Sequence, residues 1–76
     1  MTVRNWRVTL KPWADRRLWF LQARRGRRVV WGVVYDADDP DSVALARRAI
    51  ATLRAAGADC SALPSPLPGV PDAPGA

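Results

Sequence analysis

Two runs of strand-forming residues, separated by one glycine, restrict most strongly what this chain can fold into. Arg17–Arg25 and Arg27–Asp36 are rich in tryptophan, phenylalanine, valine and tyrosine, which suit the pleated surface of a sheet. Gly26 between them can supply the positive φ that a tight hairpin turn requires. The pattern therefore predicts a β-hairpin that turns at Arg25-Gly26 or at Gly26-Arg27.

A third strand is predicted ahead of this hairpin. Between Val3 and Lys11 apolar and polar residues alternate, which is the period of a half-buried strand. Pro12 is expected to end the strand, because proline cannot donate a ladder hydrogen bond, and residues 12–15 are expected to form a loop or turn. Three consecutive strands joined by short connections predict an antiparallel meander.

A helix is predicted to follow the sheet. Asp39 can accept hydrogen bonds from the first free backbone N–H groups, Pro40 suits the first helical position, and Asp41 suits the positive end of the helix dipole. The helix is expected to end near Ala56, with Gly57 in the left-handed conformation. At 100° per residue one apolar arc is formed by Val43, Leu45, Ala46, Ala49, Ile50, Leu53 and Ala56.

The last 14 residues are of a different character, with five prolines between Leu63 and Ala76. Such a composition favours an extended or polyproline-like segment. The prediction is one α+β domain over residues 1–62, followed by a flexible, disordered Pro-rich tail over residues 63–76. In this domain a three-stranded antiparallel sheet is followed by one C-terminal helix packed on one face.

Both faces of the predicted hairpin are apolar, whereas a single helix can cover only one. A two-residue loop would pair even positions of the second strand with odd positions of the third. The bulkier face is expected to meet the helix, and it carries Phe20, Trp31, Val33 and Tyr35. The other face would present Trp19, Leu21, Val30 and Val34. An exposed apolar patch usually marks an interaction surface, so this face is expected to be covered by nucleic acid, by a second protein, or by the tail through Leu63, Leu67 and Val70.

Charge favours nucleic acid as the occupant. Residues 1–31 hold eight arginines and Lys11 against Asp15 alone, a formal charge of +8, whereas residues 32–63 are mildly acidic. An anionic partner is therefore expected to meet the first half of the chain. We expect a small basic nucleic-acid-binding module, with DNA favoured over RNA, that uses the outer sheet face and the Arg-rich hairpin tip. Its expected contact residues are Arg7, Lys11, Arg17, Trp19, Arg25, Arg27 and Arg28.

The order of three strands and a helix, with a basic sheet, is similar to that of small DNA-binding domains that lay a sheet in the major groove. The arm-binding domains of tyrosine integrases are an example. The resemblance lies in element order and charge and involves no sequence motif. It implies contact between the sheet and DNA.

The alternative is a protein-interaction module. It would form a homodimer through the outer sheet face, or act as a small inhibitor or adaptor of another protein. The expected interface residues are Trp13, Trp19, Leu21, Val30 and Val34.

Other classes of function find little support in the composition. The chain has no histidine, no glutamate and one cysteine, Cys60, so neither a zinc site nor an internal disulfide is expected. The aspartates between Asp36 and Asp41 lack the spacing of a calcium loop. No nucleophile lies beside a base, so we expect no enzyme, cofactor, metal or small-molecule substrate. No apolar run reaches the length of a membrane span, and the lone cysteine favours the cytoplasm.

Overall fold

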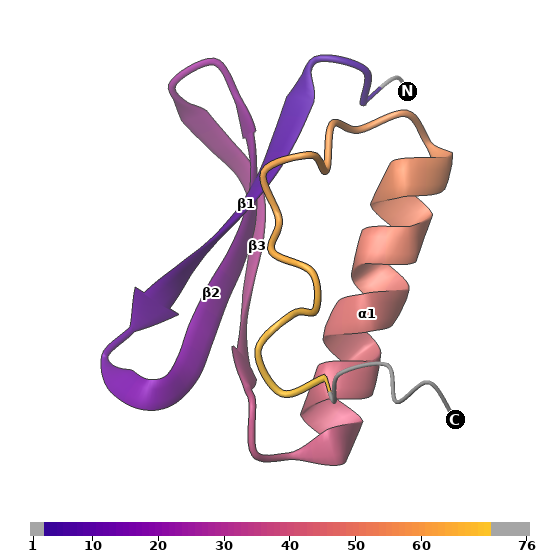
Figure 1. The fold of residues 1–76 in the computed structure, drawn as a ribbon. Coiled ribbons are helices and arrows are strands. Elements are labelled where there is room, and N and C mark those ends of the chain that lie inside the picture. The colour runs from indigo at the N-terminus through magenta and orange to yellow at the C-terminus, as the bar shows by residue number, and fades with distance from the viewer. Residues whose placement is uncertain (1–2, 71–76) are drawn as a thin grey trace.

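A computed structural model of the chain describes residues 3–70, apart from the side chains at positions 15 and 16. The elements are β1 (Trp6–Trp13), β2 (Asp15–Arg25), β3 (Arg28–Asp36) and α1 (Pro40–Ala55). The three strands form one antiparallel sheet in the order β1-β2-β3, and α1 packs against one side of it (Figure 1). The predicted α+β architecture is confirmed.

The start of α1 is as the sequence predicts. Asp39 is the N-cap, and its carboxylate accepts a hydrogen bond from the backbone N–H of Asp41 at 3.0 Å. Pro40 is the first helical residue, and Gly57 has a φ of +105° just after the helix. Leu45 departs from the predicted apolar arc, because its side chain is 63% exposed. The helical residues buried in the core are Val43, Ala46 and Ile50.

β1 runs further than predicted, through Pro12 to Trp13. Proline is tolerated there because β1 is an edge strand of the sheet. The connection to β2 is consequently very tight, and Ala14 takes a positive φ of +46° within it. The predicted loop over residues 12–15 is thus reduced to a turn around Ala14.

A β-bulge in β3 decides which side chains face the core. The hairpin turn is Gly26-Arg27, and Gly26 has a φ of +62°. Next to the turn Arg24 lies opposite Val29, but the following residue of β2, Ala23, lies opposite Trp31. Val30 is therefore an extra residue without a cross-strand partner, which is the definition of a bulge. From Trp31 onward, β3 is shifted by one residue relative to a regular hairpin.

This shift overturns part of the predicted face assignment, because a one-residue slip moves every later side chain to the other face. Leu21 faces the core and is fully buried, and Trp19 lies on the same side opposite Tyr35. Phe20, predicted in the core, lies on the outer side opposite Val34. The core consists of Val3, Val8, Leu21, Ala23, Tyr35, Val43, Ala46, Ile50 and Ala58.

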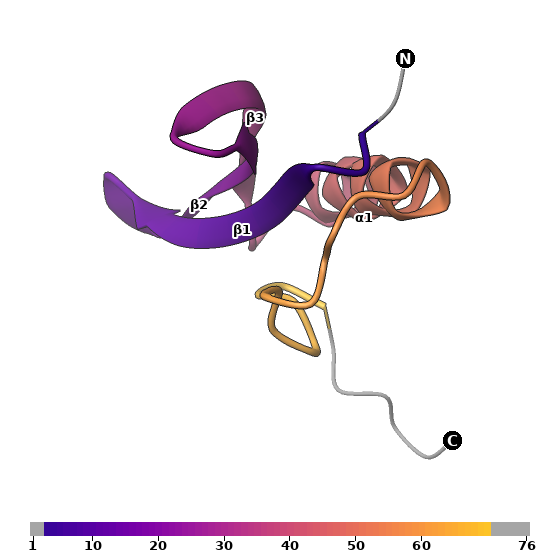
Figure 2. The same cartoon turned by 90° about the horizontal axis from the view of Figure 1, so that it is seen from above.

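After α1 the chain returns to the free edge of β1. Asp59 forms a parallel bridge there: its carbonyl accepts from the N–H of Val8 at 2.8 Å, and its N–H donates to the carbonyl of Trp6 at 2.9 Å. The segment then runs back past α1 on the same side of the sheet (Figure 2). This bridge blocks part of the β1 edge.

Residues 63–70 of the Pro-rich tail lie against the core. Leu63, Leu67 and Val70 pack there, and the phenol of Tyr35 donates a hydrogen bond to the carbonyl of Pro68 at 2.9 Å. These are the three apolar contacts expected if the tail folds back, but they are made on the helix side of the sheet and not on the outer face. Residues 71–76 of the predicted tail lie outside the described residues.

The packing of residues 63–70 against the core can be tested at Gly69, whose φ is +87°. A Cβ at this position would lie 2.5 Å from the carbonyl oxygen of Ala37 and 2.8 Å from Val43 Cγ2. We therefore expect Gly69→Ala to lower the free energy of unfolding by more than the about 1–3 kcal/mol of backbone strain alone. Gly26→Ala is the matched control, because a Cβ at Gly26 (φ +62°) meets nothing within 4 Å. Equal urea midpoints for the two variants would contradict the packing of residues 63–70.

Burial of Tyr35 predicts a pH dependence. Burial raises the pKa of its phenol above the ordinary value of 10.0, because the charged phenolate is disfavoured away from water. The folded-state pKa thus exceeds the unfolded one, so this contribution to stability is complete below pH 10 and is lost as the pH rises through the folded-state pKa. Tyr35 is the only tyrosine, so an absorbance titration reports on it alone. The midpoint is expected to be higher in buffer than in urea, and identical midpoints would refute the burial.

Candidate nucleic-acid interface

The outer face is the side of the sheet that points away from α1 and the C-terminal segment. By the strand register it carries Arg7, Thr9, Lys11, Leu18, Phe20, Gln22, Arg24, Val29, Gly32 and Val34. Four of these ten residues are large and apolar, three are cationic, two are neutral and polar, and the last is a glycine. The bulge turns Trp31, Val33 and Tyr35 to the opposite side, so the outer face mixes cationic, polar and apolar side chains and is not a continuous apolar surface.

The centre of the outer face is polar and closely packed. The side-chain amide of Gln22 donates a hydrogen bond to the hydroxyl of Thr9 at 3.2 Å, and Gln22 is 6% exposed. On the other side of Gln22 lies Gly32, which leaves room for the ring of Phe20: a Cβ there would be 2.6 Å from Phe20 Cε1. This part of the face is therefore pre-arranged, with little side-chain freedom to lose on binding.

Aromatic side chains occupy one end of the outer face. Trp13, 43% exposed, lies with its ring centroid 5.2 Å from that of Phe20. The ammonium of Lys11 lies 5.6 Å from the centroid of the same Phe20 ring. An exposed indole beside a lysine provides a flat apolar surface next to a positive charge, which is suited to a base or sugar beside its phosphate.

A basic recess occupies the other end of the face. It has a volume of about 490 Å³ and is lined by Asn5, Arg7, Thr9, Arg24 and Gly26. The guanidinium of Arg24 donates to the carbonyl of Arg27 at 3.1 Å, while its Nε is buried without a hydrogen-bond partner. The recess thus combines two guanidinium groups with a hydroxyl, which is a suitable lining for a phosphate group.

One of the two cations in this recess is partly neutralised. Arg7 Nε lies 3.7 Å from Asp59 Oδ2, and both side chains are exposed. Hydrogen bonds from the hydroxyl and then the backbone N–H of Ser61, together with Arg7, hold the pKa of Asp59 below its usual value. Asp59 therefore stays ionised at neutral pH and competes with an incoming anion for Arg7.

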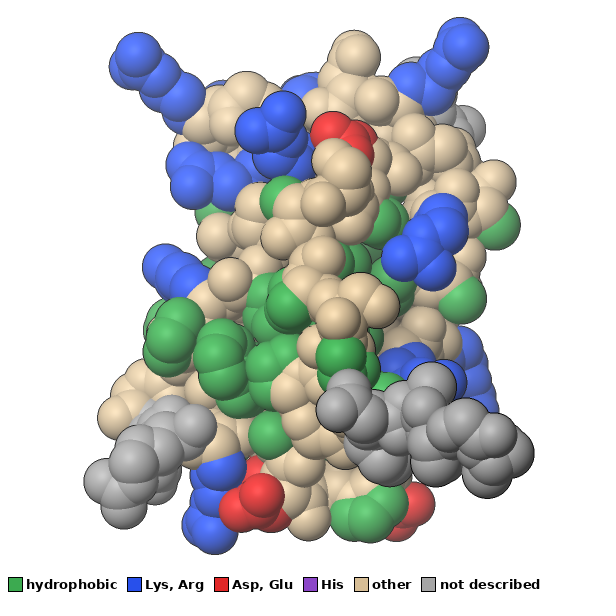
Figure 3. All heavy atoms as spheres, viewed as in Figure 1, with side chains coloured by type: hydrophobic (Ala, Val, Ile, Leu, Met, Phe, Trp, Pro, Cys, Tyr) green, Lys and Arg blue, Asp and Glu red, His purple; other side chains and the backbone are tan. Residues whose placement is uncertain are grey.

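The hairpin tip adds Arg25, Arg27 and Arg28, whose side chains are all exposed. Arg25 and Arg28 lie opposite each other across the turn. Figure 3 shows cationic side chains gathered at the end of the molecule that holds this turn, with an acidic side chain among them, and both acidic and cationic side chains at the opposite end, where α1 begins. The tip arginines therefore make the turn end of the sheet strongly basic.

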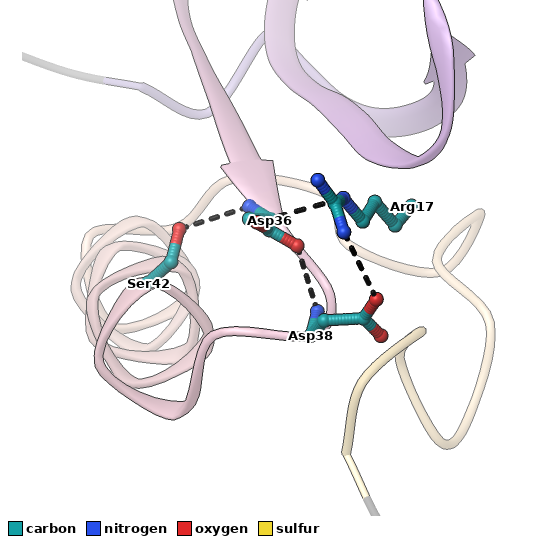
Figure 4. A network of polar contacts seen from close by, with 4 residues as sticks. All are labelled: Arg17, Asp36, Asp38 and Ser42. Atoms are coloured by element: carbon teal, nitrogen blue, oxygen red, sulfur yellow. Dashed lines mark hydrogen bonds and ion pairs between the residues drawn. The ribbon is translucent and has the colours of Figure 1, made fainter.

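Arg17 is separate from this group. Its guanidinium lies 3.9 Å from a carboxylate oxygen of Asp36 and 3.9 Å from one of Asp38 (Figure 4). The backbone N–H of Asp36 donates to the hydroxyl of Ser42 at 2.9 Å, and the carboxylate of Asp36 accepts from the N–H of Asp38 at 2.8 Å. Arg17 thus belongs to a network that joins β2, β3 and the start of α1.

The structure therefore brings together only some of the predicted site residues. Arg7, Lys11, Trp13 and Val34 lie on the outer face, and the three tip arginines lie at its end. Those that lie elsewhere are Arg17, in the network just described, Trp19, half-buried on the core side, Leu21, fully buried, and Val30, half-buried in the bulge.

Thr9 and Gln22 were not predicted from the sequence as residues of this surface, and Arg24, although part of the Arg-rich hairpin tip, was absent from the expected contact residues. The signal that points to them is that Gln22 and Arg24 have the same parity as Phe20 along β2. Two long polar side chains on one face of a strand indicate the side turned toward solvent. The large aromatic ring of Phe20 on the same face favours the opposite orientation, toward the core.

Comparison of the chain with protein-family models, with curated proteins and with solved structures found no match. Within residues 3–70, no three potential metal ligands lie close enough together to hold an ion. Within the same range, no helix has the length and hydropathy that crossing a bilayer requires.

Proposed function

We propose that this protein is a small DNA-binding module that holds duplex DNA against its outer sheet face and hairpin tip. The observation that carries the proposal is that five cations, distributed between the outer face and the hairpin tip, form no ion pair with a described carboxylate. They are Lys11, Arg24, Arg25, Arg27 and Arg28. Positive charge of this kind supplies most of the sequence-independent affinity for DNA.

The shape of the β2–β3 hairpin supports a groove-binding mode. A two-stranded ribbon fits the major groove, which is about 12 Å wide, and the tip of this ribbon carries Arg25, Arg27 and Arg28. In this mode the tip arginines contact phosphates, which fixes the orientation of the protein on the duplex. Trp13 takes the contact role that the sequence suggested for Trp19, because Trp19 lies on the core side of the sheet.

The proposal predicts a definite dependence on salt. Each phosphate contact contributes about −0.9 to the slope of log K against log salt concentration, so five contacts give about −4.5. Between about 50 and about 200 mM salt, the affinity should fall by several hundred-fold. The fluorescence anisotropy of a short labelled duplex, titrated with the protein at several salt concentrations, measures this slope.

Two outcomes would reject the proposal. One is no detectable binding of duplex or single-stranded DNA at about 50 mM salt, where phosphate contacts are strongest. The other is a clear preference for single strands over the duplex, which would assign Trp13 and Phe20 to base stacking and the surface to single-stranded nucleic acid.

The alternative of a protein-interaction module on the outer sheet face has less support. Of its expected residues only Trp13 and Val34 lie on that face, and polar side chains separate them from its other end.

We also propose that the protein acts by binding and not by catalysis. The sequence lacks histidine and glutamate, and the carboxylates of Asp36, Asp38 and Asp39 are engaged in ion pairs or capping. A cytoplasmic location is proposed on the basis of the free thiol of Cys60.

A further inference from the structure

A recess lies between α1 and the segment that follows it, on the side of the sheet opposite to the outer face (Figure 1). Its volume is about 350 Å³, which is within the range of sites for small molecules. Residues of α1 form one wall, and residues between Cys60 and Val70 form the other. The packing of Leu63, Leu67 and Val70 against the core holds the second wall in place, so the recess is present before any ligand binds.

The lining of the recess is largely apolar. Ile50, which is 4% exposed, contributes from the helix, and Leu63, Leu67 and Val70 contribute from the opposite wall. Cys60, a free cysteine that is half-buried, also lines the recess. Covering such a surface with a hydrocarbon chain removes apolar area from water, which favours binding.

Two cations of α1, Arg47 and Arg54, line the same recess and are exposed. Neither forms an ion pair with a described carboxylate, and no acidic residue among residues 3–70 lines the recess. Arg54 lies in the last turn of the helix, where a cation also suits the helix dipole, but Arg47 lies near the middle, where the dipole gives no such advantage. The recess is therefore complementary to a molecule with an apolar body and one anionic end.

We propose that this recess binds a small amphipathic carboxylate of the medium-chain fatty-acid type. Its carboxylate accepts hydrogen bonds from the guanidinium groups of Arg47 and Arg54, whose planar fork matches the two carboxylate oxygens. Its hydrocarbon chain lies against the apolar lining between the two walls. A single-chain carboxylate is the ligand because the cations come from one wall only, and the volume of the recess limits the size of the apolar part.

The test uses Cys60, the only cysteine of the chain, as a reporter, and it contains no DNA, so its result does not depend on the proposed DNA binding. Octanoate, which is ionised at neutral pH, is the ligand used. We expect octanoate to slow the alkylation of Cys60 by iodoacetamide, a neutral reagent, because a bound chain covers the thiol. The effect should saturate as the octanoate concentration rises. Octylamine, which has the same chain length and a positive charge, should give no protection.

Two double variants separate the role of these arginines from that of net charge. Arg47→Gln combined with Arg54→Gln is expected to raise the octanoate dissociation constant about tenfold, because the carboxylate loses charge-assisted hydrogen bonds. Glutamine is a good helix former, so α1 is retained. Arg25→Gln combined with Arg48→Gln is the matched control. It removes the same charge at exposed positions outside the recess and should bind octanoate as the wild-type chain does.

Three results would overturn the proposal. Alkylation that is unchanged by octanoate would show that the recess does not hold the chain, and faster alkylation would show that octanoate unfolds the protein instead. Equal protection by octylamine would remove the role of the two guanidinium groups. Equal dissociation constants for the two double variants would show that net charge, and not Arg47 and Arg54, controls binding.

Discussion

Leu21→Ala is expected to remove about 2–5 kcal/mol from the free energy of unfolding, because truncating a fully buried leucine loses its burial and leaves a cavity. A chain of 76 residues has a total stability of about 4–11 kcal/mol at the usual 0.05–0.15 kcal/mol per residue. The substitution therefore removes a large share of the total. Urea denaturation followed by tryptophan fluorescence measures the loss.

Val34→Ala is the matched control for Leu21→Ala. Val34 lies on the opposite side of the sheet and is 38% exposed, so its truncation should cost about 1 kcal/mol or less. In a hairpin without the bulge, Leu21 and Val34 would lie on the same face and the two variants would behave alike. Equal urea midpoints would therefore show that the bulge at Val30 is absent.

Replacing Lys11, Arg25 and Arg27 together by glutamine is expected to weaken DNA binding more than any single substitution on this surface. All three side chains are exposed and form no ion pair with a described carboxylate. Removing three phosphate contacts should reduce the slope of log K against log salt by about 2.7. Anisotropy titrations with the duplex used for the wild-type chain measure the slope directly.

The control for this triple variant removes the same number of charges from α1. Replacing Arg47, Arg48 and Arg54 by glutamine also lowers the formal charge of +5 by three, at positions that are exposed on the helix side. Its salt slope should stay close to the wild-type value. If both triple variants lose affinity and slope equally, net charge controls binding and the outer face has no particular role.

The parts of the fold that the sequence predicts well are those set by local interactions. The cap at Asp39, the proline at the first helical position and the glycine in the hairpin turn each act within a few residues. Their positions agree with the structure to within one or two residues. The three strands are equally clear from their composition and alternation.

The parts that could not be predicted depend on contacts between distant segments. The bulge at Val30 has no residue signature in β3, and it is stabilised by the burial of Leu21, Ala23 and Tyr35 on one side. The packing of residues 63–70 against the core likewise depends on distant partners. Tyr35 donates a hydrogen bond to Pro68, and Leu63, Leu67 and Val70 contact the core. The sequence alone shows that the first half of the chain is basic. Which of its residues lie on which face of the sheet depends on how β3 pairs with β2, including the bulge at Val30.

The bulge has a consequence for how this chain tolerates changes in length. Deleting Val30 would remove the extra residue and restore regular pairing with β2, and Trp31, Val33 and Tyr35 would still face the core. If Val30 were kept and the bulge were lost, Val30 would pair with Ala23, and Gly32 and Val34 would turn inward in place of these three side chains. The bulge thus accommodates one additional residue in β3 without changing which side chains reach the core.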